Sequence, residues 1–292
     1  MPRPQIEPAA AELAAGLPPL LARAYRLADA VSLGEQGRRQ PGQGDAFWQF
    51  RPARPGDPAR AIDWRRSARS DQHFVQEKEW QAAQAVMFWA DASAAMQFAS
   101  GAEVPRKADR AALVALALAV LLVRGGEQVG MEGLPPGRGQ VQLARLARAL
   151  EGALEGGHGP ADHAAPQPGP VPAHGRAVLL SDFLGDMAPV EATLAALADR
   201  GVRGALVMVL DPAEEDFPFH GRTIFESMTG ALRFDTRQAG ALRERYLARL
   251  EARKAALEGL AAGLGWQFHV HHTADPAAGA LLWLYHALEA QA

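Results

Sequence analysis

Residues 85–96 read Ala-Val-Met-Phe-Trp-Ala-Asp-Ala-Ser-Ala-Ala-Met, a short apolar run that stops abruptly at Asp91. Strands that are buried on both faces of a parallel sheet are continuous hydrophobic runs, so Val86–Ala90 is predicted to be a central strand. Open α/β sheets bind ligands at the carboxyl ends of their strands, which is where Asp91 and Ser93 stand. A carboxylate and a hydroxyl are hard oxygen ligands that suit Mg²⁺. This position is therefore the first candidate site in the chain.

The same alternation of buried strand and helix continues to the C-terminal end of the chain. Further strands are predicted at 128–131, 176–181, 204–210 and 266–271, and helices at 106–124, 139–154, 189–200, 239–263 and 276–290. Two of these strands also end at an aspartate, Asp182 and Asp211. An antiparallel excursion is predicted over 217–234, with Gly230 at its turn. Strands alternating with helices predict an α/β fold, a mostly parallel sheet with helices on both faces.

Three regions differ in composition. Residues 1–33 are rich in Ala and Leu and predict an N-terminal helical extension, broken near the Pro18-Pro19 pair. Residues 34–80 are an irregular segment rich in Arg, Asp and Trp, and residues 81–292 form the main domain. Within the main domain, a stretch at about 155–175 contains Gly, Pro, His and Ala without periodicity and predicts a flexible loop.

Composition limits the class of protein. A chain of 292 residues with 48% hydrophobic content can bury one large core, or one core and a smaller unit. The net charge of −3 gives no general attraction to nucleic acid or to an anionic membrane. With no cysteine there is no disulfide, thiolate metal site or thiol catalysis. The longest apolar run, Ala111–Val123, is too short to span a bilayer, so a soluble, cytoplasmic protein without a membrane span is expected.

The Arg/Asp/Trp segment allows two interpretations. Guanidinium groups beside aromatic rings bind phosphate, nucleic acid or an acidic partner, whereas Arg–Asp pairs tie an irregular segment to a sheet. The alternating sign of charge favours the structural interpretation, because a nucleic-acid surface presents unopposed cations. A partner surface is the second interpretation, and the acidic run 211–216 is either a solvated loop or a docking patch. The candidate partner-binding residues are Arg51, Arg54, Arg60, Arg65, Asp211 and Glu214.

Several motifs along the chain point to one family. They are Gly42-x-Gly44 before Phe47-Trp48, Arg51-Pro-x-x-Pro-Gly-Asp57, Ile62-Asp-Trp64, Ser67-Ala-Arg69, Ser181-Asp-Phe183, Asp211-Pro-x-Glu214 and Gly265-Trp266. In this order, over roughly residues 34–290, they resemble the bacterial domain-of-unknown-function 58 family. The resemblance implies a von Willebrand A-like fold and a gene that lies beside a MoxR-type AAA+ ATPase. The biochemical activity of the family is not established.

The resemblance also implies a comparison with a metal-ion-dependent adhesion site. Von Willebrand A-like domains that bind metal carry Asp-x-Ser-x-Ser after the first strand, a Thr from a second loop and an Asp after a later strand. Asp91, Ser93 and Asp182 match this pattern, whereas Ala95 replaces the second Ser and no Thr matches. Losing these ligands leaves a degenerate site with weakly bound Mg²⁺ or Mn²⁺, or none. In the alternative interpretation, Asp91 and Ser93 only brace the loop.

Two functions follow as hypotheses. The first is a non-enzymatic interaction or adaptor module that works with a MoxR-type AAA+ ATPase in protein maturation or assembly, because the sequence contains no assembled catalytic motif. The alternative is a metal-dependent hydrolase that uses Asp91, Ser93 and Asp182 to hold an ion and activate water. Nucleic-acid binding through residues 51–69 is a third and weaker hypothesis, so nucleic acid is not expected as a partner.

Overall fold

The computed structural model describes residues 18–35, 47–53, 62–68, 74–78, 84–156 and 161–291. The chain divides into two units, one made by residues 37–83 and the other by residues 1–36 and 84–292. Each unit has its own internal contacts.

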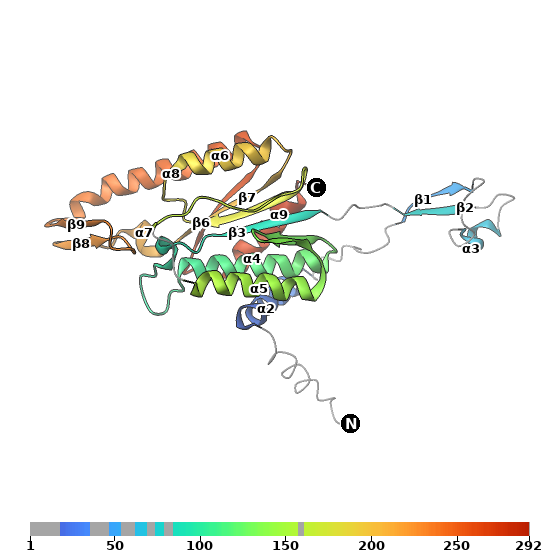
Figure 1. Cartoon of the computed structure of the whole chain (residues 1–292), viewed down its shortest axis with the longest axis horizontal. Helices are drawn as coiled ribbons and strands as arrows, with labels where there is room; N and C mark the ends of the chain where they lie inside the picture. The colour runs from blue at the N-terminus through green and yellow to red at the C-terminus, as the bar shows by residue number, and fades with distance from the viewer. Residues whose placement is uncertain are drawn as a thin grey trace, which may run out of the picture. The chain divides into compact units, whose positions relative to one another are not determined.

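The larger unit is built on a six-stranded sheet with the order β10-β7-β6-β3-β4-β5 (Figure 1). Its strands are β3 (Ala85–Ala90), β4 (Gln128–Met131), β5 (Leu134–Gly137), β6 (Arg176–Ser181), β7 (Arg203–Leu210) and β10 (Gln267–His272). Every neighbouring pair is parallel except β4 and β5. The predicted α/β fold with a mostly parallel, von Willebrand A-like sheet is therefore confirmed.

Strand β5 was not predicted, since Pro135 and Pro136 stand in its middle. Proline cannot donate a hydrogen bond to a ladder, which restricts it to edge strands. Gly133, with a φ of 71°, makes the tight turn that folds β5 back on β4. The sheet thus ends in a short antiparallel edge strand with few free donors.

Helices cover both faces of the sheet, as predicted (Figure 1). One face is covered by α4 (Lys107–Arg124), α5 (Gly139–Glu155) and α9 (Ala277–Glu289), on which α2 (Pro19–Glu35) packs, and the other by α6 (Met187–Ala198) and α8 (Arg243–Gly263). Helix α4 is apolar nearly all round because it is buried between the sheet and the neighbouring helices α2, α5 and α9. Within the described ranges, no helix combines the length and the apolarity needed to cross a bilayer.

The amphipathic pattern of the N-terminal helix is compatible with packing either on the main domain or on a partner. The structure places α2 against α4, α5 and α9, with Leu21, Ala24 and Ala28 buried in the core. The helix begins at Pro19, a residue favoured at the first helical position because its missing N–H would have no partner there. The part of the predicted helix before residue 18 lies outside the described residues. Helix α2 is therefore a structural part of the main domain.

Short elements at the carboxyl edge of the sheet connect the larger ones. They are the 3₁₀ helices η2 (Ala94–Gln97) and η3 (Ala239–Leu242), helix α7 (Pro212–Asp216), and strands β8 (Thr223–Glu226) and β9 (Arg233–Thr236). The two strands pair as an antiparallel hairpin with Gly230 in its turn, as predicted for 217–234.

The smaller unit contains an antiparallel pair of strands, β1 (Phe47–Pro52) and β2 (Phe74–Lys78), and the one-turn helix α3 (Trp64–Ser67). The weak alternation of polar and apolar residues over 73–78 is typical of an edge strand and agrees with β2, whereas β1 was not predicted. Ser67 ties α3 to β2, because its hydroxyl donates to the carbonyl of Asp63 at 2.7 Å and accepts from the amide of Phe74 at 3.0 Å.

Candidate functional site

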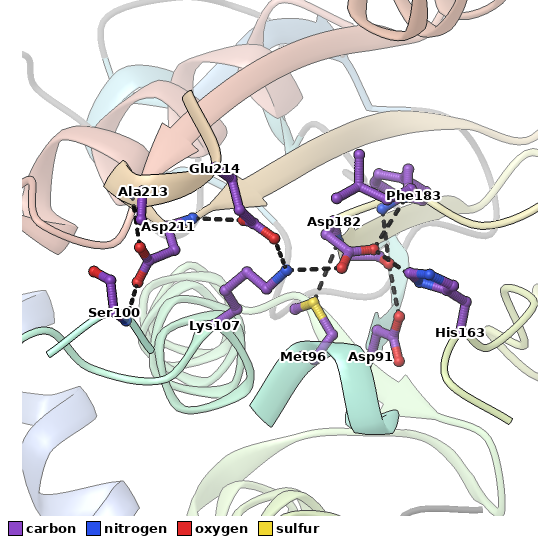
Figure 2. Close-up of polar contacts among 12 residues, drawn as sticks. Asp91, Met96, Ser100, Lys107, His163, Asp182, Phe183, Asp211, Ala213 and Glu214 are labelled. Carbon is purple, nitrogen blue, oxygen red and sulfur yellow. Dashed lines mark hydrogen bonds and ion pairs between the residues drawn. The ribbon is translucent and has the colours of Figure 1, made fainter. Parts of the chain in front are cut away.

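Three aspartates meet at the carboxyl edge of the sheet (Figure 2). Strands β3, β6 and β7 are neighbouring parallel strands, and Asp91, Asp182 and Asp211 follow them in turn. None of the three is more than 2% exposed. All three aspartates that follow a buried strand in the sequence therefore lie at the same edge of the sheet.

Asp91 is held by hydrogen bonds to both carboxylate oxygens. The hydroxyl of Ser181 donates to Oδ2 at 2.7 Å, and the amide of Ser93 donates to Oδ1 at 2.8 Å. Burial raises the pKa of Asp91 above its ordinary value, although the hydrogen bonds from Ser181 and Ser93 oppose this, and the nearby charge of Asp182 raises it further. The Ser93 hydroxyl is buried beside this carboxylate without a well-formed hydrogen bond in the described part of the chain. Asp91 thus braces the loop that follows β3.

The central group of the site is Lys107, which sequence reasoning missed. Its side chain is 1% exposed, and Nζ lies 2.8 Å from Oδ2 of Asp182 and 2.6 Å from Oε1 of Glu214 (Figure 2). Burial lowers the pKa of Lys107, but these two carboxylates more than compensate and the pKa lies above its ordinary value. A protonated ammonium therefore joins the residue after β6 to helix α7.

A signal for Lys107 was present in the sequence. It is the first residue of α4, a helix whose remaining buried residues are all apolar. A cation at a helix N-terminus is opposed by the helix dipole, and a lysine is almost never fully buried without a partner. If such a lysine is buried with its helix, it therefore needs a carboxylate partner, and the sequence does not say which one.

The two carboxylates that flank Lys107 differ in their electrostatics. Burial alone would raise the pKa of Asp182, yet Lys107, His163 and the amide of Leu184 together hold it well below its ordinary range. For Glu214 burial prevails over Lys107, and the pKa is raised. His163 Nδ1 lies 3.6 Å from Oδ1 of Asp182, and hydrogen bonding to Asp182 raises the pKa of His163 in spite of its burial. Asp182, which also has His163 and the Leu184 amide as partners, is therefore held in its ionised form beside the ammonium.

Asp211 and Glu214 form a capping box at the start of α7. Asp211 accepts from the amide of Ala213 at 2.9 Å, and Glu214 Oε2 accepts from the amide of Asp211 at 2.8 Å. The second carboxylate oxygen of Asp211 accepts from the amide of Ser100 at 2.8 Å, which fixes the loop before α4. Asp211 is fully buried and Glu214 is occupied by Lys107, so the structure places both inside the fold rather than on an acidic docking patch.

The arginines predicted to contact a partner lie in the smaller unit. Arg65 is exposed on α3, where a partner could reach it. Arg51 is part of β1, but its side chain is outside the described part of the chain, as are Arg54 and Arg60. The prediction of a partner surface here stays a prediction.

The candidate metal ligands Asp91, Ser93 and Asp182 are brought to one edge, with Ala95 close by in η2. Asp182 uses Oδ2 for Lys107 and Oδ1 for the amide of Leu184 at 3.0 Å, so neither oxygen is free. In the part of the chain that the structure describes, no three His, Asp or Glu side chains gather as a metal site. The residues present fit an internal ammonium better than a divalent ion, which Lys107 would repel. Metal binding at this edge stays a prediction.

The segment after residue 160 crosses this edge towards the hairpin. The carbonyl of Asp162 accepts from the amide of Ala95 at 2.8 Å, and its carboxylate accepts from the amide and hydroxyl of Thr229 at 2.9 and 3.0 Å. This segment also places His163 against Asp182. It has no helix or strand within residues 161–175, yet its contacts join η2 to the turn of the β8–β9 hairpin.

Comparison with known families places the chain. The family model described as "Protein of unknown function DUF58" matches residues 49–256, which is more than half of the chain and includes all three aspartates, Lys107 and the hairpin. No curated protein and no solved structure matches the chain. The chain therefore belongs to the DUF58 family of proteins of unknown function.

Proposed function

We propose that this chain is a non-enzymatic protein-interaction module that works with a MoxR-type AAA+ ATPase in the maturation or assembly of other proteins. One observation carries the proposal: the Lys107 ammonium pairs with Glu214 and with Asp182, which is one of the residues that match the metal ligands of an adhesion site. Because Lys107 pairs with a carboxylate from the loop after β6 and with one from helix α7, it holds these segments in a fixed position, which suits a surface that binds a partner.

The electrostatics of the edge support a binding role over catalysis. A general base works best with a pKa near the working pH, whereas Lys107 and His163 hold the pKa of Asp182 far below it. Asp91 has the opposite shift, but both of its oxygens accept hydrogen bonds inside the fold. The charged groups of the edge are therefore used for bracing.

The choice of partner rests on the resemblance, since members of this family tend to be encoded beside MoxR-type ATPases. The proposal places the chain in the cytoplasm, where such an ATPase has its nucleotide. Of the four arginines predicted to contact a partner, Arg65 is the one whose side chain the structure describes. It is exposed and could contact the ATPase.

The test is an association measurement by biolayer interferometry. The purified full-length chain is presented to the MoxR-type ATPase of the same organism, without nucleotide, with ADP and with a non-hydrolysable ATP analogue. We expect saturable binding that depends on nucleotide, weakened by Arg65→Glu and unchanged by Arg148→Glu, which changes another exposed arginine, on α5. The absence of association in every nucleotide state would overturn the proposal.

A metal-dependent hydrolase is the second candidate. The observation in its favour is the buried Ser93 hydroxyl, which lacks a well-formed hydrogen bond in the described part of the chain and lies beside a carboxylate. This candidate predicts hydrolysis of a generic phosphate ester with Mn²⁺ that is lost in Asp91→Asn. A rate equal to that of the metal alone would exclude it.

A further inference from the structure

A cavity of about 530 Å³ lies beside α7, between the β8–β9 hairpin and helix α8. Its size is within the range of about 300–1,000 Å³ that is typical of ligand pockets. Phe217, Phe219, Phe225, Phe234 and Tyr246 line it. In Figure 1 the hairpin, α7 and the start of α8 gather at one end of the sheet. The cavity therefore adjoins the carboxyl edge of the sheet, and nothing in the proposed function yet uses it.

The aromatic wall of the cavity is well packed. Phe217 ends α7 in the left-handed conformation, with a φ of 43°, which turns the chain towards the hairpin. Its ring centroid lies 5.0 Å from that of Tyr246, 5.2 Å from that of Phe219 and 5.8 Å from that of Phe225. Burial raises the pKa of Tyr246 to about 12, so its hydroxyl stays a neutral hydrogen-bond donor. The wall is thus preformed and apolar.

The mouth of the cavity continues into an exposed apolar surface. Phe234 pairs across the hairpin with Phe225, lines the cavity and is nevertheless 56% exposed. The hairpin also exposes Leu232, Met228 and Ile224. It forms a sheet of its own, so within the described residues its outer edges pair with no third strand. An extended polypeptide would cover the open strand edges and the apolar surface beyond the cavity. A small molecule in the cavity would leave both exposed.

The charge at the mouth is positive. Arg245 and Arg249 lie one turn apart on α8, both line the cavity and both are exposed. Neither guanidinium pairs with a carboxylate among the described residues. The one acidic residue that lines the cavity among the described residues, Glu214, is already engaged by Lys107 and by the capping box. The two arginines are therefore available to carboxylates of an incoming molecule.

We propose that this cavity binds an apolar or aromatic side chain of a partner polypeptide in which acidic residues flank that side chain. The apolar side chain enters the aromatic cavity, and the flanking carboxylates pair with Arg245 and Arg249. The inference rests on the proposed interaction function and names the place and the chemistry of one contact.

The test is selection from a random 12-residue peptide library displayed on phage, against the full-length chain. Enriched peptides are expected to combine Phe, Trp or Leu with Asp or Glu, and the best of them is then synthesised with a fluorescent label for polarisation measurements. Changing both arginines in Arg245→Glu/Arg249→Glu is expected to weaken its binding at least tenfold. Phe234→Ser is expected to weaken it several-fold.

The matched control reverses two exposed arginines on α5, in Arg145→Glu/Arg148→Glu, and is expected to change binding less than twofold. No enrichment, enriched peptides without acidic residues, or equal binding to the Arg245→Glu/Arg249→Glu variant would each overturn the inference. Phenylpropionate competing as well as the whole peptide at equal concentration would also overturn it, since the site would then be one for a small molecule.

The association assay with the ATPase separates the two proposals. If Arg245→Glu/Arg249→Glu binds the ATPase normally while no peptide is selected, the cavity inference fails and the proposed function stands. If acidic–aromatic peptides bind through the arginines but the ATPase does not associate, the cavity inference stands and the choice of ATPase fails.

Discussion

The ion-paired edge around Lys107 and the aromatic cavity beside α7 share Glu214 but treat charge in opposite ways. At the edge, Lys107 is buried between Asp182 and Glu214, and every carboxylate oxygen of Asp182 and Asp211 has a partner inside the fold. At the cavity, the arginines are exposed and unpaired within the described residues, and apolar side chains reach solvent. The comparison teaches that residues matching a known binding motif can stabilise the fold. The side chains that remain available to a partner lie in the neighbouring cavity.

The largest expected effect comes from removing the buried cation. Lys107→Met leaves Asp182 and Glu214 buried without the ammonium that pairs with both, which should lower the free energy of unfolding by about 3–5 kcal/mol. Urea unfolding followed by circular dichroism measures it. The control is Lys254→Met, because Lys254 pairs with Glu215 and Glu251 near the surface and should cost about 1 kcal/mol or less. Equal losses in the two variants would contradict the distinction between the buried pair and a surface pair.

Acid should weaken the edge through Asp182. Because its pKa is held low in the folded state, its contribution to stability is present above its unfolded pKa of about 4 and is lost as pH falls below that value. The stability difference between wild type and Asp182→Asn should therefore shrink between pH 6 and pH 3, as measured by urea titrations at each pH. A difference that stays constant over this range would show that the Asp182 charge is not what stabilises the edge.

His163, which contacts Asp182, provides a local probe of the Asp182 charge. Hydrogen bonding to Asp182 raises the pKa of His163, so its stabilising contact is complete below about pH 6.5 and is lost as pH rises through the folded pKa. An NMR titration of the histidine ring should give a pKa above 6.5 in wild type and a lower one in Asp182→Asn. A value at or below 6.5 in wild type would mean that the segment with His163 does not rest on Asp182.

The smallest expected effect on stability is at the mouth of the cavity. Phe234→Ser should change the free energy of unfolding by no more than about 0.5 kcal/mol, because the ring is more than half exposed. Phe217→Ala, by contrast, removes a buried ring from the aromatic wall and should cost about 3–5 kcal/mol. Thermal unfolding measures both. A large loss in Phe234→Ser would mean that this residue serves the fold rather than a partner.

The sequence was sufficient to predict the sheet and the aspartates at its edge. Buried strands are continuous apolar runs, and in β3, β6 and β7 the run ends at a polar residue, so local sequence places Asp91, Asp182 and Asp211. The antiparallel strand β5 was missed because its two prolines contradict a strand pattern. Local sequence therefore predicts a strand where the apolar run is uninterrupted, and fails where proline interrupts it.

The functions of these residues depend on contacts between distant segments. The partners of Lys107 stand 75 and 107 positions further along the chain, so no spacing rule connects them. The acidic run 211–216 looked like a surface patch, but the capping box and Lys107 turn Asp211 and Glu214 inward. The cavity needs α7, the hairpin and α8 to meet, and its arginines are ordinary surface residues until that arrangement is known.

The central claim is that Asp182 is neutralised by the Lys107 ammonium and not by a metal ion. Isothermal calorimetry with Mg²⁺ and Mn²⁺, on wild type and on Asp91→Ala, tests this claim most directly. The account predicts no saturable heat in wild type at millimolar ion. Saturable binding in wild type that is lost in Asp91→Ala would contradict it and would favour the metal-dependent hydrolase.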